Sequence, residues 1–333
     1  MVHWFIGSFP PTSLTKRLAL IRKKSEILAK LTQRMGAEHA RQRVAIEEVH
    51  VAQIFGQGRN FFHIENWYSV HAVIKNTLRL CFMHSKGQRN ARNIQIRYNT
   101  IQLPYLHRDL DGFTILHLSD LHLDMDEQAV FALIEQIRKV NYDICVMTGD
   151  YRASTYGDIE PSLTVMAQLR LHIKKETYAV LGNHDSILMV PALEEMGIQL
   201  LLNENTHIKQ GQGELLLAGI DDAHYFCADD IPRASIGITA STPSILLSHT
   251  PAIYKQAAAA GFNLLLSGHT HGGQCKAPFL DPPMLPVKNK KYSSGTFELD
   301  GGRSLYINRA LGHLWQVRFN TRPEITVFTL SKA

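Results

Sequence analysis

The stretch NLLLSGHTHGGQ, residues 263–274, joins a short apolar run to two histidines one residue apart and a pair of glycines. A short apolar run that ends in a glycine-rich turn is typical of a buried β-strand followed by a loop. Glycines 268, 272 and 273 allow the backbone to fold tightly around the two imidazoles. Two histidines held this closely at the end of a strand indicate a site that needs both of them.

The same pattern of short apolar runs recurs through the body of the chain. Further apolar runs stand at 113–118, 143–148, 177–181, 214–219 and 244–248, and each predicts a buried strand. Between them lie helical patterns, one of which begins near Glu127 and places Val130, Leu133, Ile134 and Ile137 on one face. Alternating strands and helices predict a layered α/β fold.

Five of these predicted strands end in side chains that can bind metal ions. They deliver Asp120 and His122, then Asp150, then Asn183, His184 and Asp185, then His249, and finally His269 and His271. Strand ends are where α/β sheets place their sites. Mixed imidazole and carboxylate ligands suit manganese, iron, cobalt or zinc, whereas oxygen ligands alone suit magnesium or calcium. Two such ions ~3.5–4 Å apart clamp both oxygens of an in-line phosphoryl displacement, so we expect a two-metal site.

In this order, the blocks DLH, GD, GNHD, a single histidine and GHTHGG resemble the calcineurin-like metallophosphoesterase superfamily over residues 110–333. The resemblance implies a β-sandwich of two sheets flanked by helices, with two metal ions at one edge. It implies that Asp120, His122, Asp150 and His271 hold the first metal, and that Asp150 bridges to a second metal held by Asn183, His249 and His269. Water would be the nucleophile. Manganese is the expected metal, with iron, zinc or cobalt as alternatives.

The resemblance also implies a role for two residues that are not ligands. His184 would stabilise or protonate the departing oxygen, and Asp185 would orient it. One position departs from the common pattern, because Arg152 stands where many relatives carry an acid after GD. Arg152 is either a contact for a substrate phosphate or a surface arginine on a loop.

The first hundred residues differ in charge from the rest. They hold 16 Lys and Arg against 5 Asp and Glu, whereas the remaining residues hold 19 against 25. Two apolar stripes at helical spacing run through this basic segment: Leu14, Leu18, Ile21, Leu28 and Met35, then Trp67, Val70, Ile74, Leu78 and Phe82. The pattern predicts a basic helical module over residues 1–92, ahead of a catalytic domain over residues 93–333. The alternation in residues 93–104 predicts a hairpin that turns at Asn99 and Thr100.

A basic amphipathic module could contact a membrane, the catalytic domain of the same chain, or nucleic acid. With Trp4 and Phe5 ahead of it, the module could rest on an anionic membrane surface, or its helices could only pack on the catalytic domain. Nucleic acid is disfavoured, because the aromatic residues belong to the helical stripes. Four cysteines without short spacings indicate a reduced protein, and no apolar run reaches the ~20 residues of a spanning helix. We therefore expect a cytoplasmic protein peripheral to the inner membrane.

The blocks AGIDDAH (218–224), LLSHTP (246–251), GHTHGGQ (268–274) and VRFNTRPEIT (317–326) resemble a bacterial, membrane-associated branch of the superfamily. That branch includes a UDP-2,3-diacylglucosamine pyrophosphatase of lipid A synthesis. The function expected from this resemblance is hydrolysis of a lipid-linked pyrophosphate, UDP-2,3-diacylglucosamine, to UMP and the lipid monophosphate. The alternatives are a soluble nucleotide phosphodiesterase or nuclease, and a scaffold without catalysis.

Overall fold

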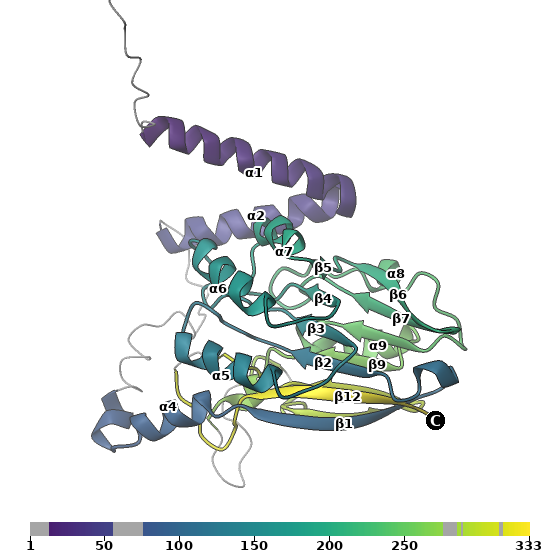
Figure 1. Ribbon diagram of the computed structural model, residues 1–333. Coiled ribbons are helices and arrows are strands. Elements are labelled where there is room, and N and C mark those ends of the chain that lie inside the picture. Colours follow the sequence, from purple (N-terminus) through teal and green to yellow (C-terminus); the bar gives the residue numbers. More distant parts are fainter. Residues whose placement is uncertain (1–12, 56–75, 276–284, 288, 313–315) are drawn as a thin grey trace, which may run out of the picture.

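The apolar runs of the sequence form the central strands of two six-stranded sheets in the computed structural model (Figure 1). The structure describes residues 13–55, 76–275, 285–287, 289–312 and 316–333. The first sheet has the order β1 (Gln95–Leu103), β12 (Glu324–Lys332), β2 (Thr114–Leu118), β3 (Ile144–Thr148), β4 (Thr177–Val180) and β5 (Ile198–Leu200). The second has the order β10 (Gly295–Leu299), β11 (Arg303–Ile307), β9 (Leu264–Ser267), β8 (Ser244–Leu247), β7 (Gly213–Gly219) and β6 (Glu204–Gln210).

The two sheets pack face to face around a shared apolar core. Ile115, Val146 and Val180 of the first sheet lie in one buried cluster with Leu217 and Leu247 of the second. The strands β2, β3 and β4 are parallel to one another, as are β7, β8 and β9. Parallel strands covered on both faces read as continuous apolar runs, which explains the sequence pattern. The predicted two-sheet sandwich flanked by helices is confirmed.

Helices cover the outer faces of the sandwich. The first sheet is covered by α5 (Glu127–Ile137), α6 (Glu160–Arg170) and α7 (Val190–Glu195), and the second by α8 (Ile231–Ala234) and α9 (Tyr254–Ala259). The helix predicted near Glu127 begins there because the Asp126 side chain accepts hydrogen bonds from the N–H groups of Gln128 and Ala129. A short helix, α4 (His84–Arg92), leads into β1.

The hairpin predicted over residues 93–104 is wrong. Residues 95–103 form the single strand β1, which pairs in parallel with β12 and places Asn99 opposite Phe328. β1 is an edge strand in which Tyr98, Thr100 and Gln102 are exposed and Ile101 and Leu103 are buried. The alternation of polar and apolar residues changes phase at Asn99 and Thr100, but the strand continues through both residues without a turn.

The N-terminal segment forms two long helices, α1 (Ser13–Met35) and α2 (Ala37–Phe55), joined at Gly36. Leu31, Met35 and Ala40 are buried in the same cluster as residues of the helices that cover the first sheet, so the pair packs on that side of the body (Figure 1). Leu28 also packs on this cluster, so the first predicted stripe faces the body in its described part. The division at residues 92 and 93 stays a prediction.

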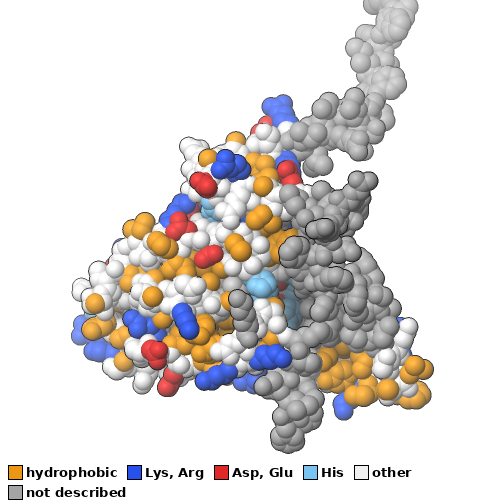
Figure 2. All heavy atoms as spheres, turned by 180° about the vertical axis from the view of Figure 1, so that it is seen from behind, with side chains coloured by type: hydrophobic (Ala, Val, Ile, Leu, Met, Phe, Trp, Pro, Cys, Tyr) orange, Lys and Arg blue, Asp and Glu red, His pale blue; other side chains and the backbone are white. Residues whose placement is uncertain are grey.

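Much of the second stripe, with Trp67, Val70 and Ile74, lies outside the described residues, as do Trp4 and Phe5. Phe82, the last member of that stripe, is 93% exposed. Within the described ranges, no helix combines the length and apolarity needed to cross a bilayer. Figure 2 shows acidic and basic side chains interspersed on the face opposite to that of Figure 1.

Candidate metal centre

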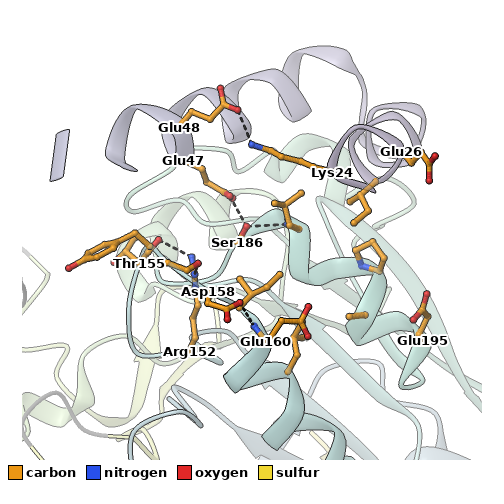
Figure 3. Close-up of a pocket in the computed structure, with 18 of the residues that line it drawn as sticks. Lys24, Glu26, Glu47, Glu48, Arg152, Thr155, Asp158, Glu160, Ser186 and Glu195 are labelled. Atoms are coloured by element: carbon orange, nitrogen blue, oxygen red, sulfur yellow. Dashed lines mark hydrogen bonds and ion pairs between the residues drawn. The ribbon is translucent and has the colours of Figure 1, made fainter. Parts of the chain in front are cut away.

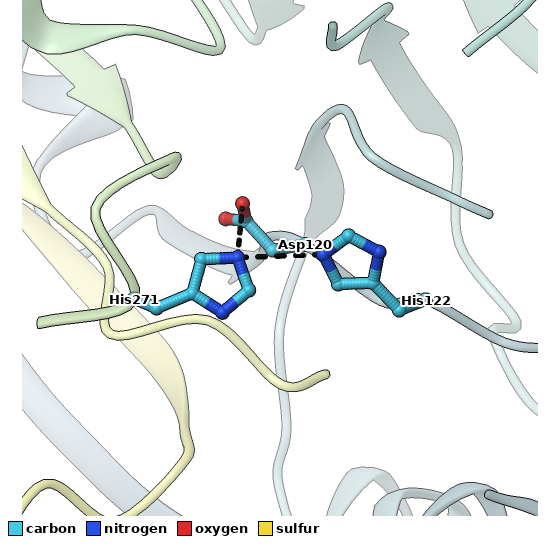
Figure 4. Close-up of side chains that lie close together, drawn as sticks. All are labelled: Asp120, His122 and His271. Carbon is cyan, nitrogen blue, oxygen red and sulfur yellow. Dashed lines mark hydrogen bonds and ion pairs between the residues drawn. The ribbon is translucent and has the colours of Figure 1, made fainter. Parts of the chain in front are cut away.

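The carboxyl ends of five strands from both sheets meet at one edge of the sandwich. They bring together two groups of buried side chains: Asp120, His122 and His271 in the first (Figure 4), and Asp150, His249 and His269 in the second. In each group the possible ligand atoms lie within 4.8 Å of one another. This clustering within a few ångströms is what metal coordination requires. The structure therefore has two candidate metal-binding triads.

Asp150 lies between the two groups. Its Oδ2 atom is 3.3 Å from Nε2 of His249 in the second group and 3.9 Å from Nε2 of His122 in the first. Asn183 completes the second group, because its Oδ1 atom is 2.9 Å from His249 Nε2. The geometry thus brings together all seven side chains expected to be ligands, with Asp150 where a bridging carboxylate is needed. Their roles as ligands stay predictions.

Backbone carbonyls fix the two central imidazoles with Nε2 pointing inward. Nδ1 of His122 is 2.8 Å from the carbonyl oxygen of Arg152, and Nδ1 of His249 is 2.8 Å from that of Thr148. A carbonyl only accepts, so Nδ1 donates, and Nε2 is the ring atom left to bind a metal cation or a proton. The Nε2 atom of His249 faces an acceptor, Asn183 Oδ1. Inward-pointing Nε2 atoms held in this way fit metal ligation.

The charges at the site agree with this geometry. Burial would raise the pKa of Asp150, but the His249 and His184 imidazoles hold it well below its usual range. Burial lowers the pKa of His249, yet the Asp150 carboxylate overrides it and raises that pKa to about 10. Burial lowers the pKa of His122 to about 3, so its ring is neutral. A proton on His249 occupies the place of a cation, and metal binding must displace it.

Five of the candidate ligands have left-handed backbone conformations. The φ angles are +51° at Asp120, +40° at His122, +56° at Asp150, +67° at His269 and +50° at His271. This conformation is uncommon for residues other than glycine and costs of order 1 kcal/mol each. Strained residues of this kind concentrate at functional sites, because the surrounding fold holds them there.

The structure differs from the role expected of Asp185. Its carboxylate accepts hydrogen bonds from the N–H groups of Asp150, Tyr151 and Gly182, at 2.7, 2.8 and 2.8 Å. The His184 ring instead has its Nδ1 atom 3.1 Å from the hydroxyl of Thr155. Asp185 therefore holds the two loops that carry the ligands and does not orient His184 by direct contact. No sequence signal pointed to Thr155.

Arg152 is not a surface arginine. It is buried, and its guanidinium donates to the carbonyl oxygens of His184, Thr155 and Gly157. These bonds hold the loop that follows β3 against the GNHD loop. The expected contact with a substrate phosphate stays a prediction.

His224 lies beside His269, and it is not among the candidate ligands expected from the sequence, although the block AGIDDAH contains it. Its ring centroid is 4.4 Å from that of His269, and its side chain is exposed. An exposed imidazole beside a candidate ligand can contact whatever enters the site.

Buried imidazoles and carboxylates at the common edge of two sheets form two candidate metal-binding triads, the kind of arrangement that a two-metal hydrolase needs. The family model for calcineurin-like phosphoesterases matches residues 113–273. Phosphodiesterase YaeI of Escherichia coli is 30% identical over 249 residues, which is 69% of this chain and 86% of that protein. Two uncharacterized metallophosphoesterases of Bacillus subtilis, YkuE and YkoQ, are each 29% identical and cover 71% and 72% of this chain and 85% and 92% of their own lengths.

The chain belongs to the calcineurin-like phosphoesterase family. It is a metal-dependent phosphoester hydrolase.

Proposed function

We propose that this chain hydrolyses a phosphodiester or pyrophosphate bond at the two metal-binding triads, with Asp150 shared between them. Two bound divalent ions would acidify the attacking water and neutralise charge on the phosphate oxygens. The observation that carries the proposal is the position of Asp150 Oδ2, within 3.9 Å of an imidazole Nε2 atom from each group. Manganese is the metal we expect, because the groups mix imidazole with carboxylate.

His184 is proposed to supply the proton that the leaving oxygen needs. Its Nε2 atom faces the metal centre, 3.8 Å from Asp150 Oδ2. When the Thr155 hydroxyl donates to Nδ1 at 3.1 Å, the ring proton must reside on Nε2. His184 then presents a donor to the oxygen on which charge builds as the bond breaks.

For the substrate, we propose a lipid-linked pyrophosphate, with UDP-2,3-diacylglucosamine as the best candidate. A cleft of about 700 Å³ supports an apolar substituent (Figure 3). Its walls include Ile27 of α1, Leu163 of α6 and Pro191 of α7, and Thr155, which contacts His184, lies on its lining. An acyl chain of the substrate held in this cleft would lie beside Thr155, which contacts His184. The binding energy of the acyl chain could then position the phosphates.

A second candidate is a water-soluble phosphodiester. The relative YaeI carries the name phosphodiesterase, and this favours a phosphodiester substrate. The two candidates share the same chemistry at phosphorus and differ only in what occupies the cleft.

The roles at the metal centre are tested with bis-p-nitrophenyl phosphate and elemental analysis. Asp150→Ala should lose both metal and turnover, because it removes the shared carboxylate. His184→Ala should keep both metals and lose turnover by about 10²–10⁴-fold, the usual contribution of a proton donor. Full metal in the Asp150 variant, or an empty centre in the His184 variant, would contradict these roles.

The substrate is tested by comparing UDP-2,3-diacylglucosamine with UDP-N-acetylglucosamine. The lipid proposal expects a much higher kcat/KM for the diacylated compound and release of UMP. Equal efficiency on both compounds would favour the soluble diester.

A further inference from the structure

Helix α2 contacts the loop that carries His184. The Glu47 carboxylate accepts a hydrogen bond from the Ser186 hydroxyl at 2.7 Å (Figure 3). It accepts a second from the Ile187 N–H at 2.8 Å. One turn earlier on the same helix, Nη2 of Arg43 donates to the carbonyl oxygen of Asp185 at 2.8 Å. Three consecutive residues after His184 are therefore fixed by two side chains from a helix about 140 residues away in the chain.

Arg43 reaches this loop from a fully buried position. Its guanidinium carbon lies 3.3 Å from the centroid of the Phe226 ring, and its Nε atom is 3.7 Å from Asp221 Oδ2 and from Glu47 Oε1. Within the described part of the chain, Nε and Nη1 of Arg43 have no hydrogen-bond partner. Burying a cation with unused donors costs free energy, so stability alone is a poor reason for this arrangement.

The other side of the same loop is bonded to the metal centre. The N–H of His184 donates to Asp150 Oδ1 at 2.9 Å, and the Asp185 carboxylate receives the N–H groups of Asp150 and Tyr151. The segment from Gly182 to Ile187 thus lies between α2 and the central carboxylate. A displacement on the α2 side must move His184 relative to Asp150, because the loop is held on both sides.

We infer that α2 is part of the catalytic apparatus, with Arg43 and Glu47 as positioning residues that set the orientation of His184. The inference rests on the role proposed above for His184. It assigns to the N-terminal extension a function at the active site that does not depend on a membrane or on the nature of the substrate.

Glu47→Ala is the variant that tests this, because truncating the fully buried Arg43 would risk unfolding the chain. The variant removes both acceptors from the loop and leaves the metal ligands untouched. With bis-p-nitrophenyl phosphate and saturating manganese, we expect kcat to fall about tenfold or more, KM to change less than twofold and metal content to stay at the wild-type value. Glu47→Gln keeps one acceptor oxygen and should recover part of kcat.

Glu38→Ala is the matched control. Glu38 lies in the first turn of α2 with its side chain 90% exposed, so the change weakens the same helix without touching the loop. It should leave kcat at the wild-type value. If Glu38→Ala and Glu47→Ala lower kcat equally, α2 acts only through the general stability of the fold and the inference is wrong.

A double-mutant cycle separates positioning from other effects. In a His184→Ala background, Glu47→Ala should cause no further loss of kcat, because the group it positions is gone. The same tenfold loss in both backgrounds would overturn the inference. Full turnover by His184→Ala alone would instead refute the proposed role of His184, so the two failures are distinguishable.

Discussion

Replacing Gly268 with alanine tests how closely the loop after β9 approaches the first group of ligands. A Cβ atom on residue 268 would lie 1.8 Å from Ser119 Oγ and 2.2 Å from Asp120 Oδ2. Ordinary contact begins at 3.4 Å, so these atoms must separate by more than 1 Å. The φ angle of Gly268 is not among the positive ones, so the backbone itself accepts alanine. The whole effect therefore comes from the clash.

Ser119 cannot absorb the displacement alone. Its hydroxyl donates to Asp120 Oδ2 at 2.5 Å and accepts from the Thr148 hydroxyl at 2.7 Å. The shift therefore passes to the Asp120 carboxylate. Overpacking of a core costs ~1–3 kcal/mol, and a misplacement of ~1 Å in a catalytic site costs ~10²-fold in rate. We expect Gly268→Ala to lower kcat about a hundredfold and to weaken metal binding by the first group.

The assay is turnover of bis-p-nitrophenyl phosphate, together with metal content and the thermal midpoint. Gly112→Ala is the control, because Gly112 has φ +84° but no atom within 4 Å of the added methyl group. That variant should lose ~1 kcal/mol of stability through its backbone alone and keep its activity. Wild-type turnover and full metal content in Gly268→Ala would refute the reasoning.

Three further predictions concern stability at low pH, the metal dependence of hydrolysis and binding to anionic membranes. Burial lowers the pKa of His117 and His122 to about 3, whereas their unfolded values are 6.5, so the unfolded chain binds more protons between these values and stability falls as the pH drops through this window. His269, whose pKa burial holds well below its usual range, adds to this loss, whereas Asp185, whose pKa burial raises to about 6, acts in the opposite sense and is outnumbered. The thermal midpoint should therefore fall from pH 6 to pH 4.5, and it should fall less in His117→Gln. A chelator should abolish hydrolysis, and manganese should restore it better than magnesium; equal recovery with magnesium would contradict the mixed ligand set. The full chain should bind anionic vesicles and release them as salt rises from 0.1 M to 0.5 M, and equal binding to neutral vesicles would count against a membrane role.

The candidate ligands could be predicted from the sequence, whereas the pairing of the first strand of the sheet could not. Each candidate ligand follows a buried strand directly, so local pattern and chemistry alone identified Asp120, Asp150 and His249. The partner of β1 could not be found this way, because β12 lies more than 200 residues further along the chain. The phase change at Asn99 and Thr100, which the sequence suggests is a turn, lies within one continuous edge strand.

Contacts between distant segments account for the remaining differences. Thr155 bonds to His184 from a loop without a recognisable motif, and Glu47 bonds to Ser186 from α2, whose sequence lies between the two predicted stripes and carries no motif. A pattern reports which face of an element is apolar, but it does not report which side chain crosses to a loop elsewhere. For Asp185, the sequence placed the residue at the site, and only the structure shows that its bonds go to backbone N–H groups.

The left-handed backbone at five candidate ligands means that the residues needed for catalysis also strain the fold. Asparagine and glycine adopt this conformation more readily than histidine, so exchanging His271 for either residue should relieve backbone strain as it removes the activity. The relief is ~1 kcal/mol per position, in a fold whose total stability is ~5–15 kcal/mol, but the loss of the contact between the His271 imidazole and the buried Asp120 carboxylate opposes it. A descendant of this chain freed from selection for hydrolysis would have to replace both members of such a pair before the relief of strain made it harder to melt.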